Sequence, residues 1–132
     1  MIFSSSILTA VGSRANQRRG AAAERVVGDY YFAQGFSLLA TNQRFGPLEL
    51  DLIVRKDTLV IIVEVRTRRP GALVGPFASV TAPKRRRLKR ARDLLWRSLA
   101  SDKTITRFRV DVAAVDLWSC PVVVDIASAI AL

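Results

Sequence analysis

Asp51 and the tripeptide Glu64-Val65-Arg66 lie in two neighbouring segments that are otherwise apolar and rich in β-branched residues. Such segments are typical of buried strands, where an ionised carboxylate is costly unless it is paired or binds a metal. Mg²⁺ prefers oxygen ligands and often takes only one or two carboxylates, with water or phosphate oxygens completing its shell. The two acids therefore predict a site for Mg²⁺ or Mn²⁺, and Arg66 is placed to stabilise negative charge on a phosphate.

A structural interpretation of the same residues stands beside the metal site. Asp51 and Glu64 would then be acids of edge strands that balance Arg66 and other cations. Glu49, two residues before Asp51, either supports a metal ligand or faces solvent. Glu24, in a predicted helix, either joins the site or forms an ion pair on the helix face.

The residue types that are missing narrow the chemistry. The chain has no histidine and one cysteine. These counts exclude catalytic triads, histidine general bases and an intramolecular disulfide, and they argue against structural zinc. Carboxylates, Lys, Arg, Tyr or Ser must perform any catalysis. A single cysteine is typical of a reducing compartment, so we expect a cytoplasmic protein.

Positive charge is concentrated in one part of the chain. The net charge is +10, and eleven of the 21 basic residues lie between Arg66 and Arg97. Such a field attracts polyanions, of which DNA and RNA are the commonest. The residues predicted to contact nucleic acid are Arg68, Arg69, Lys84, Arg85, Arg86, Arg87, Lys89 and Arg90. A solvated helix face is the structural alternative, and the narrow apolar stripe of this segment argues against a membrane surface.

Hydrophobic periodicity predicts the elements that position these residues. We expect a helix over 15–34 that carries Glu24, and strands over 36–42, 48–55 and 58–67. A two-residue hairpin at Lys56-Asp57 would pair Asp51 with Ile62 and place Glu64 diagonally opposite. The two-residue period then puts Glu49, Asp51, Glu64 and Arg66 on one face, and the even-numbered residues 48–54 on the other.

A second helix should start at Thr81, an N-cap, with Pro83 in its first turn, and run to Ala100. Strands over 106–115 and 121–126 follow, where Asp111 is interpreted as a sheet-edge charge. Trp96 and Phe108 are interpreted as core or boundary residues. The order of elements predicts a mixed α/β sheet of about five strands flanked by helices. Residues 15–132 form one domain, and residues 1–14 are predicted to be a disordered extension.

Five stretches together carry a resemblance to a known family. They are Ala23-Glu24, Leu48-Glu49-Leu50-Asp51-Leu52-Ile53, Val63-Glu64-Val65-Arg66-Thr67-Arg68, Pro83-Lys84-Arg85-Arg86-Arg87-Leu88 and Arg107-Phe108-Arg109-Val110-Asp111-Val112. In this order they resemble the uncharacterised YraN family of the PD-(D/E)XK nuclease superfamily, over roughly residues 18–129. The resemblance implies a restriction-endonuclease-like three-layer core, similar to that of Holliday-junction resolvases, with a carboxylate-bound divalent metal near DNA.

The resemblance assigns roles residue by residue. Asp51 and Glu64 match the metal carboxylates, Glu24 matches an acid of the first helix that completes the metal shell, and Lys84 lies where the family tends to carry lysine. Two positions depart from the pattern. Leu48 replaces the glycine of Gly-Glu-Ile-Asp, and Arg66 replaces the catalytic lysine of E-x-K. A guanidinium stays protonated, so Arg66 can stabilise charge but cannot accept a proton.

Three functions are therefore compatible with the sequence. The first is a Mg²⁺-dependent DNA phosphodiesterase, endonuclease-like and with branched DNA among its candidate substrates, or a relative with reduced activity. In this reading Asp51, Glu64 and Arg66 are the catalytic residues. The second is a DNA- or RNA-binding module that kept the fold without the chemistry. The third is a basic adaptor that recognises acidic protein partners.

Overall fold

Helices and strands follow one another along the chain in the predicted order. The computed structural model describes residues 11–68, 78 and 80–128. The elements are α1 (Val11–Phe32), β1 (Ser37–Phe45), β2 (Leu48–Lys56), β3 (Leu59–Thr67), α2 (Ala82–Ser98), β4 (Arg107–Asp116) and β5 (Val123–Ala127). No helix in these described segments is long and apolar enough to cross a membrane.

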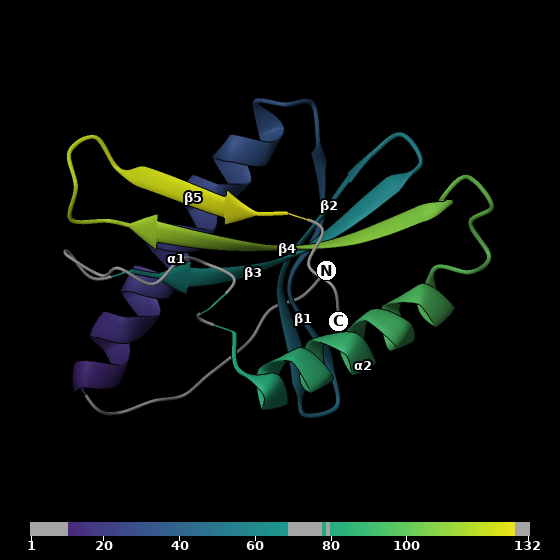
Figure 1. Ribbon diagram of the computed structural model, residues 1–132, viewed down its shortest axis with the longest axis horizontal. Helices are drawn as coiled ribbons and strands as arrows, with labels where there is room; N and C mark the ends of the chain where they lie inside the picture. The colour runs from purple at the N-terminus through teal and green to yellow at the C-terminus, as the bar shows by residue number, and fades with distance from the viewer. Residues whose placement is uncertain (1–10, 69–77, 79, 129–132) are drawn as a thin grey trace.

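The strands form one mixed sheet in the spatial order β1-β2-β3-β4-β5. Neighbouring strands are antiparallel except β3 and β4, which are parallel and are connected through α2. A parallel pair needs such a crossover because the chain must return to the same end of the sheet. Figure 1 shows α2 alongside the sheet, and along the chain this helix follows β3 and precedes β4. The predicted mixed α/β sheet is confirmed.

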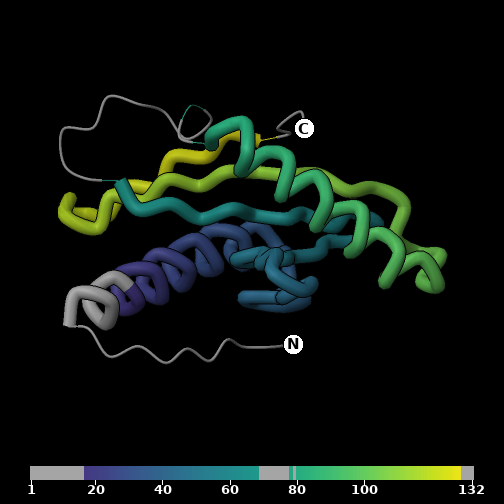
Figure 2. Tube along the Cα trace, turned by 90° about the horizontal axis from the view of Figure 1, so that it is seen from below, coloured from purple at the N-terminus to yellow at the C-terminus, as the bar shows by residue number. Residues whose placement is uncertain are grey.

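One helix covers each face of the sheet, which gives three layers (Figure 2). Leu88, Ala91 and Leu95 of α2 lie in a buried cluster on one face. The cluster on the opposite face contains Ala23 and Val27 of α1. The central strand β3 is buried on both faces, which explains its continuous apolar run. The expected three-layer core is therefore present.

The helix boundaries differ slightly from the predicted ones. α1 begins at Val11, so residues 11–14 are helical, whereas the sequence predicted them to be part of a disordered extension. Residues 1–10 lie outside the described residues. Thr81 is the N-cap of α2, as predicted, and its Oγ1 accepts a hydrogen bond from the backbone N of Lys84 at 3.4 Å. This cap and Pro83 fix the start of α2, and with it the position of Lys84.

The hairpin between β2 and β3 turns one residue later than predicted. Lys56 pairs with Leu59, and Asp57 takes a positive φ of 54° in the turn. Ile62 therefore lies opposite Ile53, so the predicted pairing of Ile62 with Asp51 is wrong. The correction moves the register by two positions, and an even shift does not by itself exchange the two faces of a strand.

β2 changes face at Asp51, which the two-residue period did not predict. Leu48 and Leu50 pack in the cluster beneath α2. Leu52 and Val54, expected on the same face as these two, pack beneath α1. A regular strand cannot place residues of equal parity on opposite faces, so the strand is irregular between Leu50 and Leu52. This irregularity positions the candidate site.

Candidate functional site

Asp51 lies where β2 separates from β3. Pairing of the two strands starts at Leu52 and Val63, and the residues of β2 before this pair form strand pairs only with β1. Beyond it, the backbone N–H of Val65 donates to Asp51 Oδ2 at 2.9 Å. The side chain thus accepts a hydrogen bond from a β3 amide that β2 no longer reaches. Figure 1 shows the β1–β2 hairpin bending away from β3 toward the first turns of α2.

Glu64 presents its carboxylate on the α2 side of this opening. Only 3% of Glu64 is exposed. Its Oε2 lies 3.1 Å from Lys84 Nζ and 3.9 Å from Arg66 Nη1. Among the described residues, Glu64 Oε1 is a buried side-chain oxygen that accepts no hydrogen bond. A buried acceptor without a partner costs ~1–3 kcal/mol, and more when it is charged, so this oxygen is suited to a cation.

The surroundings of Asp51 disfavour its ionised form. Burial raises the pKa of Asp51 well above its ordinary value, and the neighbouring Glu64 and then Glu24 add to the rise. The Val65 N–H and Lys84 act in the opposite direction but do not compensate. A divalent cation between the carboxylates would reverse the balance, because it favours the charged form of each ligand.

Glu24 and Glu49 flank Asp51 on opposite sides. Asp51 and Glu24 line a cavity of about 300 Å³ beside α1. Asp51 and Glu49 line another of about 220 Å³ beside α2, which Lys84 and Arg87 also line. Asp51 therefore borders a cavity on each side of the sheet.

Both flanking acids also have local partners. Glu24 Oε1 accepts a hydrogen bond from Asn42 Nδ2 at 3.3 Å, and Asn42 itself has a positive φ of 49°. Burial raises the pKa of Glu24, Glu49 and Glu64 raise it further, and the Asn42 hydrogen bond lowers it. Glu49 Oε2 lies 3.4 Å from Arg44 Nη2. Glu49 lines the same cavity as Asp51, which is compatible with the predicted role of Glu49 in supporting a metal ligand.

The donor set suits a cation that keeps part of its water shell. Within the described part of the chain, no group of three or more acidic, cysteine or histidine residues is arranged as a metal site. Mg²⁺ does not need one, because it is commonly held by one or two carboxylates with several waters. Asp51 and Glu64 match that requirement. The ligand role of Glu24 stays a prediction.

The residues predicted to bind nucleic acid differ in their exposure and in their partners. Arg86, Arg87, Lys89 and Arg90 are exposed on α2, and Arg85 Nε donates to the Val80 carbonyl at 3.3 Å. Lys84 instead points into the acidic site. Arg68 Nη2 lies 3.0 Å from Asp125 Oδ2 and ties β3 to β5. Arg69 lies outside the described residues.

A buried ionic cluster on the α1 side was missed by the sequence interpretation. Asp111 is 0% exposed, so its assignment as a sheet-edge charge is wrong. Tyr31 Oη donates to Asp111 Oδ2 at 2.6 Å, and Arg109 Nε donates to Asp111 Oδ1 at 2.9 Å. The strand β4 lies inside the sheet between β3 and β5, which is why Asp111 is covered. The cluster fastens the end of α1, and therefore the helix that carries Glu24, to the sheet.

The fold and the acidic opening between β2 and β3 together define the class of protein. A five-stranded mixed sheet with one helix on each face, and an acid followed by E-x-R on adjacent strands, is a restriction-endonuclease-like core of the PD-(D/E)XK nuclease superfamily. The profile of the uncharacterised protein family UPF0102 matches residues 23–115, which include the acids and α2. The chain belongs to this family, also called the YraN family.

Curated relatives from distant bacteria have the same family name. A UPF0102 protein of Sorangium cellulosum is 41% identical over 114 residues, covering 81% of this chain and 79% of the relative. One from Symbiobacterium thermophilum is 37% identical over 95 residues, covering 72% and 80%. One from Dichelobacter nodosus is 39% identical over 87 residues, covering 64% and 68%.

Proposed function

We propose that the protein binds nucleic acid and hydrolyses phosphodiester bonds of DNA with a divalent metal, Mg²⁺ or Mn²⁺, held by Asp51 and Glu64. The metal would polarise the phosphate and lower the pKa of the attacking water. Glu24 and Glu49 would orient water at the edges of the site. Arg66 and Lys84 would stabilise negative charge on the phosphate, and the exposed cations of α2 would bind the phosphate backbone.

The single observation that carries this proposal is the buried carboxylate of Glu64. Its Oε1 accepts no hydrogen bond within the described residues. A second acid, Asp51, lies on the next strand and adds negative charge to the same place. A purely structural ion pair would be expected to satisfy both oxygens and to lower the pKa of the acid beside it. The pKa of Asp51 is raised instead. Unbalanced acids of this kind are found at catalytic and metal-binding sites.

Lys84 changes the meaning of the substitution at Arg66. The ammonium of Lys84 is nearer to Glu64 Oε2 than the guanidinium of Arg66, at 3.1 Å against 3.9 Å. A lysine ammonium is compact and its pKa responds to its surroundings, whereas arginine stays charged. In an E-x-K motif the strand supplies a lysine, and here Lys84 of α2 would supply the ammonium instead. We propose Lys84 as the main cation of the site and Arg66 as a contact to the phosphate.

Metal-dependent cleavage tests the central claim. Purified protein would be incubated with linear, flapped and branched DNA in Mg²⁺, in Mn²⁺ and in EDTA. We expect cleavage only with metal, and its loss in Asp51→Ala with DNA affinity retained. Asp29→Ala, which removes an exposed acid from α1, is the matched control. Full activity of Asp51→Ala would remove this residue from the site, and inactivity of the wild type with every metal and substrate would leave a non-catalytic binding module.

The two cations can be separated by paired substitutions. Lys84→Gln is expected to lower kcat by about 10²-fold or more, on the scale seen for electrostatic groups at a reacting centre. Arg66→Lys should keep most of the activity, because it preserves the charge. If Arg66→Gln were the more damaging substitution and Lys84→Gln were neutral, the assignment of Lys84 would be wrong.

A further inference from the structure

Trp96, near the end of α2, has an arrangement that its predicted boundary role does not explain. It is 48% exposed, although tryptophan is the largest apolar side chain of the helix. The Phe108 ring of β4 packs edge-on against it, with ring centroids 4.7 Å apart. This contact holds the indole in one orientation while leaving much of its surface open. An exposed aromatic ring that is held in place can stack on a flat ligand without a large entropy cost.

The open surface of Trp96 belongs to a cavity of about 260 Å³. Leu99, Ile105 and Phe108 form apolar walls, and Lys103 adds a cation at the rim. The carboxylate of Asp102, which also lines the cavity, is bound to Arg55 Nη1 at 2.9 Å and to Thr104. The cavity therefore combines an aromatic platform with a positive charge.

Basic side chains lead along α2 to this cavity. Arg85, Lys89, Arg92 and Trp96 are spaced at i, i+4, i+7 and i+11, so they share one side of the helix over about 16 Å. Asp93 forms an exposed ion pair with Arg92 at 3.1 Å, and such pairs contribute little and exchange readily for a phosphate. A row of cations that ends at an aromatic platform matches a polyanion with flat aromatic groups.

We propose that this side of α2 binds a single-stranded segment of nucleic acid and that one unpaired base stacks on Trp96 in the cavity. The inference rests on the proposed nucleic-acid-binding function and specifies its substrate as one that has an unpaired strand. A base inside a duplex is covered by its neighbours on both faces, so a blunt duplex offers the indole only the outer faces of its two terminal base pairs. Stacking on aromatic side chains is the common means of holding single strands without reading sequence.

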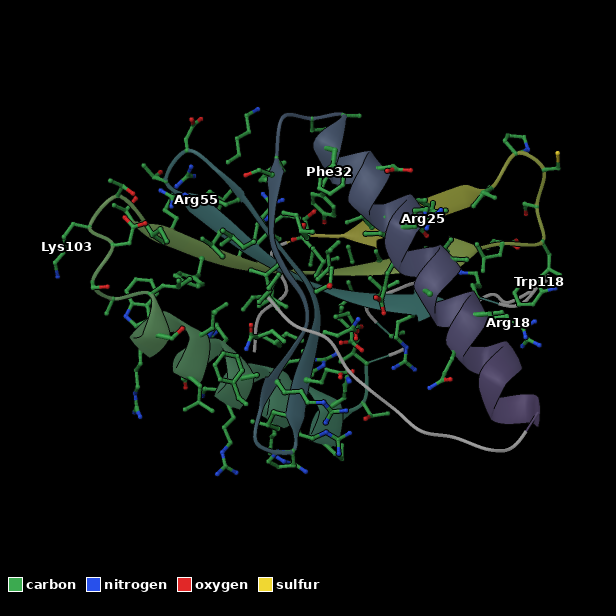
Figure 3. The ribbon with its side chains drawn as sticks, turned by 180° about the vertical axis from the view of Figure 1, so that it is seen from behind. Arg18, Arg25, Phe32, Arg55, Lys103 and Trp118 are labelled. Atoms are coloured by element: carbon green, nitrogen blue, oxygen red, sulfur yellow. The ribbon has the colours of Figure 1, made fainter. Side chains whose placement is uncertain are left out.

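Tryptophan fluorescence gives a direct test, because the chain has two tryptophans and Trp96 can be isolated. The second, Trp118, lies near Arg18 at the opposite end of the molecule from Lys103 (Figure 3). In Trp118→Phe, Trp96 is the only tryptophan, and excitation at the red edge of the absorption band avoids the tyrosines. We expect saturable quenching of this variant by single-stranded oligothymidylate in EDTA, and little by a blunt duplex of equal length. The absence of quenching by the single strand would overturn the proposal.

Affinity measurements complete the test. Trp96→Ala should weaken binding of the single strand by about 5- to 150-fold and change duplex affinity less than twofold. Trp96→Phe, which keeps a ring, should recover part of the loss. Phe32→Ala removes another exposed ring, on α1, and should have no effect. An unchanged single-strand affinity for Trp96→Ala, or an equal loss for duplex, would refute the stacking site. These measurements need no metal, so a failure of the cleavage proposal would not affect them.

Discussion

The bond between Tyr31 and Asp111 offers the most direct test of how the sheet holds α1. Tyr31→Phe removes one hydroxyl and keeps the ring, which packs edge-on against Phe36 at a centroid distance of 5.6 Å. The lost interaction is a 2.6 Å hydrogen bond between two buried groups. Asp111 keeps its bonds to Arg109, so the substitution weakens the cluster without leaving the acid alone.

The size of the effect follows from the charge on the acceptor. A hydrogen bond to a charged group contributes ~1.5–3 kcal/mol to the free energy of unfolding. For 132 residues the entropy of unfolding is about 0.28 kcal/mol/K, from ~2.1 cal/mol/K per residue. Tyr31→Phe should therefore lower Tm by about 5–11 °C.

Thermal and urea unfolding followed by circular dichroism would measure this change. The neighbouring Tyr30 is 42% exposed, and Tyr30→Phe should change the free energy of unfolding by less than about 0.5 kcal/mol. Equal shifts for the two variants would show that the Asp111 bond is not special. In a double-mutant cycle with Asp111→Asn, a coupling energy near zero would refute the reasoning altogether.

Alkaline pH provides an independent check on the same bond. Burial, and then the hydrogen bond to Asp111, raise the pKa of Tyr31 above its ordinary value of 10.0. The unfolded chain loses the phenolic proton near pH 10, while the folded chain keeps it. The contribution of the group is thus complete below pH 10 and is lost as the pH rises above it. The stability difference between wild type and Tyr31→Phe should narrow over that range.

Four further substitutions test the site and α2. Asp51→Asn should raise the Tm of the EDTA-treated protein at pH 8, because the raised pKa means that the ionised carboxyl destabilises the fold. The gain should shrink as the pH falls and the wild-type carboxyl takes up its proton, and a lower Tm at pH 8 would contradict the electrostatic account. Thr81→Ala should cost about 1 kcal/mol in urea unfolding through loss of the α2 N-cap, and no change would mean that the cap bond is not formed in solution. Lys89→Gln and Arg90→Gln should each reduce the log-log salt slope of duplex affinity by about 0.9, and unchanged slopes would mean that neither residue contacts a phosphate.

The order of the elements was predictable because local signals were strong. Apolar alternation marks β2 and β3, and Gly46-Pro47 marks the turn before them. Parity predicted that Asp51 and Glu64 are close, and from Leu52 to the hairpin turn the predicted faces survived a turn placed one residue too early because the register moved by two. A register error of one position, or of any odd number, would have placed the two acids on opposite faces of the sheet.

Features that depend on a third element were not predictable from local pattern. The irregularity at Asp51 involves the Val65 amide on β3 and lies beside Asn42, which has a positive φ on β1. Nothing in the alternation of β2 itself reveals either partner. The burial of Asp111 depends on β4 lying inside the sheet, which is a property of the crossover through α2. The crossover through α2 also places Lys84 beside Glu64.

The crossover also connects the two parts of the proposed function. Lys84 is bonded to Glu64 from the first turn of α2, and the same helix displays the exposed cations and Trp96. In an E-x-K arrangement the lysine is carried by the strand, so its position does not depend on the helix. Here a phosphate backbone bound as proposed would contact the same helix that supplies the ammonium beside Glu64. Replacing the strand lysine by Arg66 thus leaves the site dependent on α2 for its nearest ammonium. For the same reason, substitutions that shift the start of α2, such as Thr81→Ala, should reduce cleavage more than binding if Lys84 serves the chemistry.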